Sequence, residues 1–516
     1  MTKKTEKGKR EQQMLLSEVL GNEEYRVLSG SDSCEITSVE YDSRKIQPGS
    51  LFVAIIGFTS DGHSFIRQAV ESGASAVLAD SRREGFPAEE LKETCGSSCT
   101  LVEVCDTRRF LALASAAFAS HPEREITISG ITGTKGKTTS TFMLHAMLEK
   151  AGMGAGLIGT VQNVIAGKVI HAEHTTPEAK EIYGMLSDLR DAGIGNLVME
   201  VSSQGLKLDR VYGIRYKCAC FTNLYEDHIT PNEHPDMEDY MRCKLKIFDN
   251  CEYGIINTDC EDGRRAEEYA RPKCKVITYG LGAGADVRAA DLTKKRIGHV
   301  TGTEFTLTSP FYNGKVFTAL PGEFNVYNAL CAISCAGVLG VDFEYVKQAL
   351  EEISVPGRVQ PVANNLGITV LVDYAHNAAA LESVIHTLRD YTTGRIITVF
   401  GCGGNRAKTR RFEMGEVSGN LSDYTVITSD NPRKEEPEAI IADIVTGISK
   451  TSGKYEIVID RAEAIRKAID MAQSGDTVLI AGKGHEDYQI FADQTIHFDD
   501  YEQAQIALEK AEAKRT

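Results

Sequence analysis

The feature that most constrains this chain is a glycine-rich loop between an apolar strand and a helix. Residues 126–128 favour a strand, residues 130–136 contain three glycines, and residues 138–150 favour a helix. Such a loop turns backbone N–H groups toward phosphate oxygens, and the start of the helix adds positive potential. Ile131 stands where the standard pattern has its first glycine, so an ordinary turn with an incidental lysine is the alternative. We predict a nucleotide-phosphate site built from Gly133, Thr134, Lys135, Gly136, Lys137, Thr138 and Thr139.

A magnesium ion would accompany a bound nucleotide. Lys137 would reach the β- and γ-phosphates, and Thr138 would bind the metal. Mg²⁺ prefers hard oxygen ligands. Glu200 ends the apolar run 196–201, and His228 follows the strand-like run 218–222. From spacing alone both remain ambiguous, because Glu200 could be a solvated rim residue and His228 a structural histidine.

Length and charge limit the class of protein. The 516 residues suggest about three domains. A net charge of −16 disfavours a nucleic-acid partner, and no apolar run reaches the roughly 18 residues of a membrane span. The 13 scattered cysteines are typical of reduced thiols, and the lysine-rich start lacks the apolar stretch of a secretory signal. We therefore expect a cytoplasmic protein that binds neither nucleic acid nor membrane. We also expect a monomer, although nothing in the sequence fixes the oligomeric state.

The last third of the chain alternates strands and helices, as a mostly parallel α/β sheet does. Four strand-like runs lie at 368–372, 396–400, 424–428 and 477–480, with helical runs such as 435–450 between them. Ligands bind such sheets beyond the carboxyl ends of the strands. We therefore predict that a ligand site is formed by the four segments after these strands, 373–376, 401–404, 430–433 and 482–486.

These segments, in this order, resemble the Mur ligase family. The resemblance rests on the glycine loop, residues 199–203, 222–224 with 227–228, 373–376 and 482–486, while residues 42–44, 48–49 and 51–54 resemble its MurE branch. It implies an α/β protein with a tail at 1–14 that we expect to be disordered, followed by three domains. These are a UDP-precursor-binding domain at 15–121, a central P-loop-type ATPase with a mostly parallel sheet at 122–354, and a Rossmann-like amino-acid-binding domain at 355–516.

The resemblance implies an ATP-dependent amide-forming ligase. ATP would phosphorylate a carboxylate of UDP-N-acetylmuramoyl-L-alanyl-D-glutamate, and an amine of meso-2,6-diaminopimelate would attack the acyl phosphate. Positioning and charge neutralisation dominate such phosphoryl chemistry. Mg²⁺ would assist, held by Thr138, Glu200, His228 and a CO₂-derived carbamate on Lys244. The implied catalytic residues are Lys137, Lys244, His228 and Glu200.

The resemblance also implies binding residues for each substrate. Further ATP contacts would be Asn325, Asn328, Arg358 and Asp373. The UDP-precursor contacts would be Tyr41, Ser43, Phe58, Thr59, Ser60, Thr175, Thr176, Ser202 and Arg210. The amino-acid contacts would be Arg411, Asp430, Asn431, Pro432, Arg433, Gly482 and Glu486.

The sequence gives two conflicting indications about which amino acid is the substrate. Arg433 can hold the far carboxylate of diaminopimelate bidentately, which favours that substrate over L-lysine. Residues 230–235 instead resemble lysine-adding relatives. A sister ligase, such as folylpolyglutamate synthetase or the D-alanyl-D-alanine-adding enzyme, and a non-catalytic P-loop regulatory protein are also compatible with the glycine loop. Residues 42–44 and 430–433 count against the sister ligases, and the retained Lys137, Glu200, His228 and Lys244 count against a non-catalytic protein.

Overall fold

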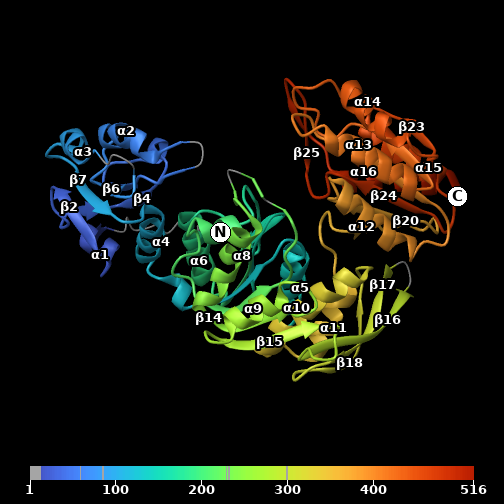
Figure 1. The fold of residues 1–516 in the computed structure, drawn as a ribbon, viewed down its shortest axis with the longest axis horizontal. Helices are drawn as coiled ribbons and strands as arrows, with labels where there is room; N and C mark the ends of the chain where they lie inside the picture. Colours follow the sequence, from blue (N-terminus) through green and yellow to red (C-terminus); the bar gives the residue numbers. More distant parts are fainter. Residues whose placement is uncertain are drawn as a thin grey trace, which may run out of the picture. The chain divides into compact units, whose positions relative to one another are not determined.

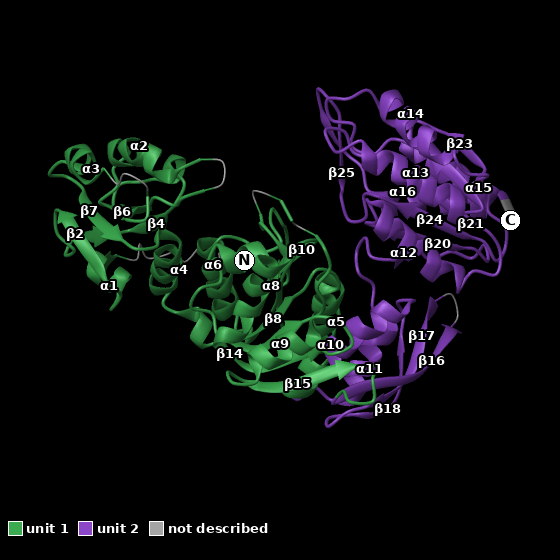
Figure 2. Cartoon of the chain, in the orientation of Figure 1, with its two compact units in different colours: residues 1–285, 334–339 green, residues 286–333, 340–516 purple. Residues whose placement is uncertain are grey.

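The computed structural model describes residues 13–57, 60–83, 87–227, 229–230, 233–297 and 300–515 (Figure 1). The chain divides into two compact units (Figure 2). Unit 1 comprises residues 1–285 and 334–339, and unit 2 comprises residues 286–333 and 340–516. No helix within the described ranges combines the length and the apolar character that crossing a bilayer requires.

The first sheet of unit 1 has five strands, parallel except for β2. Asp106 caps the helix after its last strand by accepting hydrogen bonds from the backbone N–H groups of Arg108 and Arg109. In spatial order the strands are β2 (Tyr25–Ser29), β7 (Thr100–Val104), β6 (Ala76–Asp80), β5 (Ser50–Val53) and β4 (Ser38–Glu40); the helices are α1 (Leu16–Leu20), α2 (Ile66–Glu71), α3 (Ala88–Cys95) and α4 (Thr107–Phe118), and the short pair β1 (Met14–Leu15) and β3 (Glu35–Ile36) lies beside them.

The second sheet of unit 1 carries the glycine loop. The loop leaves the buried strand β8 and enters helix α5, as predicted. In spatial order the strands are β11 (Lys168–His171), β10 (Gln162–Ile165), β9 (Gly156–Ile158), β12 (Asn196–Glu200), β8 (Thr127–Thr132), β13 (Tyr216–Phe221), β14 (Cys251–Asn257) and β15 (Lys275–Gly280), and those from β9 to β15 run parallel. The helices are α5 (Lys137–Lys150), α6 (Ala179–Asp191), α7 (Ser203–Lys207), α8 (Met237–Leu245) and α9 (Gly263–Ala270).

Unit 2 contains an antiparallel meander and a six-stranded sheet that is parallel except for β19. The meander is β16 (Val287–Ile297), β17 (Val300–Thr308) and β18 (Asn313–Thr318), followed by α10 (Glu323–Leu339), which begins in this unit, and α11 (Phe343–Glu352). The sheet order is β19 (Gln360–Pro361), β20 (Thr369–Asp373), β24 (Thr477–Ala481), β21 (Ile396–Phe400), β22 (Tyr424–Ile427) and β23 (Tyr455–Ile457). The remaining elements are α12 (Ala378–Arg389), α13 (Thr409–Leu421), α14 (Pro437–Ile448), α15 (Arg461–Met471), α16 (Asp500–Arg515) and the hairpin of β25 (Tyr488–Ile490) and β26 (Thr495–His497).

Alternating side chains of this six-stranded sheet pack into two separate hydrophobic cores. Val478 and Ile480 pack with residues of α15 and α16, while Leu479 and Ala481 pack with residues of α12, α13 and α14. Strands β20, β24, β21 and β22 are parallel neighbours in that order. Their carboxyl ends therefore lie at one edge, which confirms the gathering of the four polar segments expected from the sequence.

Gly133 has no room for a side chain. Its φ is 147°, and an added Cβ would lie 1.9 Å from Thr222 Oγ1. We predict that Gly133→Ala lowers the melting temperature more than Gly152→Ala, because Gly152 has a similar left-handed requirement (φ 68°) but open space around it. Adding Thr222→Ala to Gly133→Ala should recover part of the loss. Equal melting temperatures for the two single variants, measured by calorimetry, would contradict the clash.

Candidate active site

The glycine loop is held by the two residues that follow β13. The backbone N–H of Lys135 donates to Asn223 Oδ1 at 2.8 Å, and the backbone N–H of Thr134 donates to the carbonyl of Asn223 at 3.0 Å. Thr222 Oγ1 donates to the carbonyl of Lys135 at 2.7 Å. The loop shape is therefore set from a neighbouring strand end. The sequence placed Thr222-Asn223 in a motif but gave Asn223 no role.

Two lysine amines meet at one carbonyl oxygen of this loop. Lys137 Nζ and Lys244 Nζ each donate to the carbonyl of Gly133 at 2.9 Å. Lys244 is 1% exposed. Burial, together with the positive charge of Lys137, holds the pKa of Lys244 well below its usual range. The amine of Lys244 is therefore poised to be neutral, the form that reacts with electrophiles such as CO₂.

Hard oxygen donors lie beside the start of α5. Glu200, which ends β12 and is 1% exposed, accepts hydrogen bonds from Thr138 Oγ1 at 3.0 Å and from the backbone N–H of Thr160 at 2.8 Å. A carboxylate next to a hydroxyl is a donor set that suits Mg²⁺. His228 lies outside the described residues, so its predicted role as a ligand stays a prediction.

Four residues predicted to contact the UDP-precursor come together around Thr176. Thr176 Oγ1 donates to the carbonyl of Glu200 at 3.0 Å and accepts from the backbone N–H of Ser202 at 2.9 Å. Arg210 donates to the carbonyl of Thr176 at 2.9 Å. Thr175 Oγ1 lies 2.9 Å from Thr160 Oγ1. This cluster therefore adjoins the carboxylate of Glu200.

The remaining predicted contacts to the UDP-precursor lie in the first sheet region. Tyr41 Oη donates to Glu181 Oε1 at 3.0 Å, which joins the end of β4 to helix α6. Ser43 Oγ donates to Gln68 Oε1 at 2.9 Å. Ser60 accepts a hydrogen bond from the backbone N–H of Gly57 at its carbonyl. Phe58 and Thr59 lie outside the described residues.

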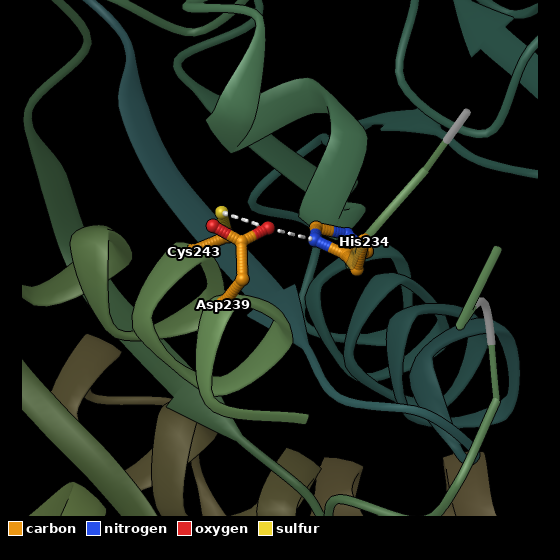
Figure 3. A group of neighbouring side chains, drawn as sticks. All are labelled: His234, Asp239 and Cys243. Carbon is orange, nitrogen blue, oxygen red and sulfur yellow. Dashed lines mark hydrogen bonds and ion pairs between the residues drawn. The ribbon is translucent and has the colours of Figure 1, made fainter. Parts of the chain in front are cut away.

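A buried Ser–His–Asp arrangement joins α7 to α8. Figure 3 shows two of its members, His234 and Asp239, together with Cys243. His234 lies 2.8 Å from Asp239 Oδ2 and 2.9 Å from Ser203 Oγ, and Cys243 Sγ lies 4.0 Å from the same carboxylate oxygen. The geometry could suggest a metal site. However, Asp239 already pairs with Lys207 and Arg242, and both ring nitrogens of His234 have partners. We therefore interpret the group as a structural hydrogen-bond network that fixes the position of α8, the helix carrying Lys244.

Unit 2 holds the other predicted nucleotide contacts. Asn328 Nδ2 donates to Asn325 Oδ1 at 3.0 Å, and Asn325 Nδ2 donates to the carbonyl of Pro321 at 2.8 Å. The guanidinium of Arg358 stacks over the ring of Tyr374, 5.1 Å from its centroid. Burial raises the pKa of Asp373, although the positive charge of Arg358 opposes the shift. Both asparagines are buried, and each holds its neighbour in place.

Arg433 is held in a strained backbone conformation at the carboxyl edge of the sheet. Its φ is 56°, which a non-glycine residue adopts at a cost of roughly 1–3 kcal/mol. Its backbone N–H donates to the carbonyl of Ile490 at 3.0 Å, and its guanidinium donates to the carbonyl of Gly404 at 2.8 Å. Strain of this kind concentrates at functional sites, where it orients a side chain.

A carboxylate with a raised pKa adjoins the segment 430–433. Glu486 Oε2 accepts from Asn431 Nδ2 at 2.8 Å and from Lys483 Nζ at 3.1 Å. Burial is the main cause that raises the pKa of Glu486, and Asp430 adds to it. Gly482 is required beside them, because its φ is 114° and an added Cβ would lie 3.0 Å from Asp430 Oδ2. Pro432 is buried in the same segment.

Arg411 is less available for a ligand than the sequence suggested. It is 1% exposed, and its guanidinium donates to Glu435 at 2.8 Å and to Asp443 at 2.9 Å. A ligand carboxylate would have to displace one of these partners. Arg406 is exposed and flanks the same glycine as Arg433, since a Cβ on Gly403 would lie 3.0 Å from the Arg433 guanidinium and 3.9 Å from Arg406 Cγ. Sequence reasoning missed Arg406, although it directly follows Gly403-Gly404-Asn405 at the end of β21.

Comparisons with known proteins match all three parts of the chain. Residues 35–119 match the Mur ligase family catalytic domain, residues 131–336 the Mur ligase middle domain, and residues 357–484 the Mur ligase glutamate ligase domain. The chain is 43% identical to a UDP-N-acetylmuramoyl-L-alanyl-D-glutamate--2,6-diaminopimelate ligase of Clostridium botulinum, over 95% of this chain and 98% of that protein. A ligase of the same name from Clostridium tetani is 42% identical, over 96% and 100%.

A solved structure extends the likeness to three dimensions. It is described as a UDP-N-acetylmuramoyl-L-alanyl-D-glutamate--2,6-diaminopimelate ligase, and it matches with a TM-score of 0.70 at 27% identity. The match covers 98% of this chain and 100% of that chain. The glycine loop, the buried lysine beside it and the loops of the last sheet thus occur in a chain that matches all three domains, and the chain belongs to the Mur ligase family.

Proposed function

We propose that this chain is an ATP-dependent ligase that adds meso-2,6-diaminopimelate to UDP-N-acetylmuramoyl-L-alanyl-D-glutamate in peptidoglycan synthesis. The names of its relatives support the reaction. The observation that carries the choice of amino acid is Arg433, held at a φ of 56° in the segment 430–433, whose Asn431 donates a hydrogen bond to Glu486. An oriented guanidinium suits a substrate whose far end bears a carboxylate.

The reaction has two steps, formation of an acyl phosphate and attack on it by an amine. An oxygen of the substrate carboxylate attacks the γ-phosphorus of ATP, and ADP leaves. The amine nitrogen of the amino acid then attacks the carbonyl carbon of the acyl phosphate, inorganic phosphate leaves, and the nitrogen loses a proton. A carboxylate is a poor acyl donor, so phosphorylation supplies the leaving group. The protein contributes mainly orientation and charge neutralisation.

Residues at the glycine loop would serve the first step. The amine of Lys137, now on the carbonyl of Gly133, would turn to the phosphates when nucleotide enters. Thr138 and Glu200 would hold Mg²⁺, which supplies positive charge against the transferred phosphoryl group. We further propose that the neutral amine of Lys244 adds CO₂, forming an N–C bond and releasing one proton. The resulting carbamate anion would sit beside the cation of Lys137, where the neutral amine stood before.

The loops of the last sheet would serve the second step. Arg433 and Arg406 would hold the far carboxylate of diaminopimelate, and Glu486 would hold its ammonium. We propose that Arg411 supports these loops through Glu435, which also accepts a hydrogen bond from the backbone N–H of Asn405. L-lysine lacks the far carboxylate, so its ammonium would face poorly paired arginines.

The lysine-adding alternative rests on residues 230–235. Within this stretch, His234 contacts Ser203, Asp239 and the ring of Tyr240. These contacts fix α8 in unit 1, so they give His234 a local structural role. We therefore favour diaminopimelate on the chemistry of the loops in unit 2.

The three parts of the chain would divide the substrates. We propose that residues 15–121 and the cluster around Thr176 bind the UDP-precursor, that residues 122–354 bind ATP, and that residues 355–516 bind the amino acid. We also propose that the UDP-linked precursor is cytoplasmic and that the enzyme is a monomer.

We predict that phosphate release with the UDP-precursor and ATP is far faster for meso-diaminopimelate than for L-lysine. Arg433→Ala should raise the KM for diaminopimelate by about a hundredfold, since one charge-assisted contact contributes about 1.5–3 kcal/mol, and should leave the KM for ATP nearly unchanged. The control is Lys434→Ala, which alters the exposed neighbouring cation. A kcat/KM for L-lysine equal to that for diaminopimelate would refute the substrate assignment.

The pH dependence should report Glu486. Because its pKa is raised, Glu486 takes up a proton at a higher pH than an ordinary glutamate does, and the neutral form no longer attracts an ammonium. We predict that the KM for diaminopimelate rises as pH falls through this pKa and that Glu486→Gln, with a high KM throughout, lacks that rise. An identical rise in KM at low pH in the parent and in Glu486→Gln would show that another group titrates.

We predict that Lys244 carries a carbamate. In ¹³C-bicarbonate the protein should show a carbamate carbonyl resonance that Lys244→Ala lacks and that Lys246→Ala, altered two residues away, retains. Lys244→Ala should lose nearly all activity and regain part of it with a short added carboxylate. A resonance that survives in Lys244→Ala would place the modification elsewhere.

A further inference from the structure

A fully buried ion pair lies beneath the proposed amino-acid loops. Arg461, the first residue of α15, and Asp500, the first residue of α16, both have side chains that are 0% exposed. Arg461 donates to Asp500 through Nε at 2.7 Å and through a terminal nitrogen at 2.7 Å. Burying two charges is costly, and apolar residues of similar volume often stabilise a folded protein equally well. A contribution to stability alone therefore does not explain why the ion pair is present.

The same guanidinium reaches the ends of two strands that are not neighbours. It donates to the carbonyl of Ala481 at 3.0 Å and to the carbonyl of Ser429 at 3.3 Å. Ala481 ends β24, Ser429 lies just beyond β22, and β21 runs between those strands. Sheet hydrogen bonds therefore cannot join these two strand ends directly. Arg461 spans the gap with donors in a fixed planar fork, which lysine does not have.

Each carbonyl belongs to the root of one of the loops described above. Ser429 directly precedes the segment 430–433 that carries Arg433, and Ala481 directly precedes Gly482 and the loop that carries Glu486. Further contacts tie the same loops together, since Gln489 Nε2 donates to the carbonyl of Asp430 at 2.7 Å. The separation of Arg433 from Glu486 thus depends on where the roots of their loops are held.

We propose that Arg461 is a positioning residue for amino-acid recognition, held by Asp500, that sets the spacing between the loop of Arg433 and the loop of Glu486. This inference rests on the proposed function, because it assumes that both loops bind the amino acid. Diaminopimelate is recognised at two charged groups of fixed separation. A shift of one loop against the other therefore weakens binding without touching ATP or the UDP-precursor.

Another ion pair in the same sheet provides a matched control. Arg395 precedes β21, and Asp476 precedes β24, so this pair lies at the amino ends of the strands. Arg395 donates to Asp476 at 2.7 Å and to the carbonyl of Met471 at 3.0 Å. Arg395, whose side chain is 42% exposed, links the amino ends of two neighbouring strands and the end of α15, at the edge away from the proposed loops.

The test compares Arg461→Lys, Arg395→Lys and Arg433→Ala in the full chain, with KM measured for each substrate and melting temperature measured in parallel. We expect Arg461→Lys to raise the KM for diaminopimelate about tenfold or more, since a misplacement of about 1 Å can cost on the order of a hundredfold. Its KM for ATP and for the UDP-precursor should stay within about twofold of the parent, as should all KM values of Arg395→Lys. If Arg461→Lys does not fold, the double variant Arg461→Met with Asp500→Leu replaces it, because it leaves no unpaired buried charge.

The outcomes separate this inference from the proposed function. A raised KM for diaminopimelate in Arg433→Ala but not in Arg461→Lys, or in the double variant that replaces it, would overturn the positioning role and leave the loops as the binding site. An unchanged KM in both Arg433→Ala and the Arg461 variant would overturn the amino-acid site itself. Equal increases in KM for all three substrates in the Arg461 variant would show a general structural role and reject the proposal.

Discussion

Parallel strand pairing is the constraint on which the rest of this structure depends. In a parallel sheet every strand delivers its carboxyl end to the same edge, so loops distant in the sequence become neighbours. In unit 1 the glycine loop after β8, Glu200 at the end of β12 and Thr222 after β13 meet in this way. In unit 2 the segments after β20, β21, β22 and β24 do the same. The sheets bring these loops next to one another, and separate contacts must then hold each loop in one conformation.

Those fixing contacts come from polar side chains, of which His234 and Arg461 are buried. Asn223 holds the backbone of the glycine loop, His234 latches α7 to α8, and Arg461 holds two loop roots. Asn223 and Arg461 make hydrogen bonds that irregular backbone cannot make with itself. An unsatisfied buried polar group costs on the order of 1–3 kcal/mol. A rigid site built from loops therefore needs a layer of buried donors and acceptors beneath it.

Periodicity and composition predicted the strands, the helices and the edge at which ligands bind. Lys137 and Thr138 followed from the local strand–loop–helix pattern, which needs no tertiary information. The contact of Thr138 with Glu200 depends on β8 and β12 being neighbours, which only the family resemblance suggested. The roles of Arg411 and Arg406 depend on which faces of α13 and of the preceding loop are covered, and a single sequence does not encode that in any simple period.

The left-handed backbone of Arg433 has a consequence for how this protein would respond to selection. Glycine or asparagine would adopt a φ of 56° at lower cost, so either replacement relieves strain. A screen that rewards heat resistance alone would therefore favour losing this arginine. Under the role proposed for Arg433, directed evolution toward heat resistance would need a growth-linked or catalytic selection at the same time, because the most stable variants would otherwise lose their selectivity for the amino acid.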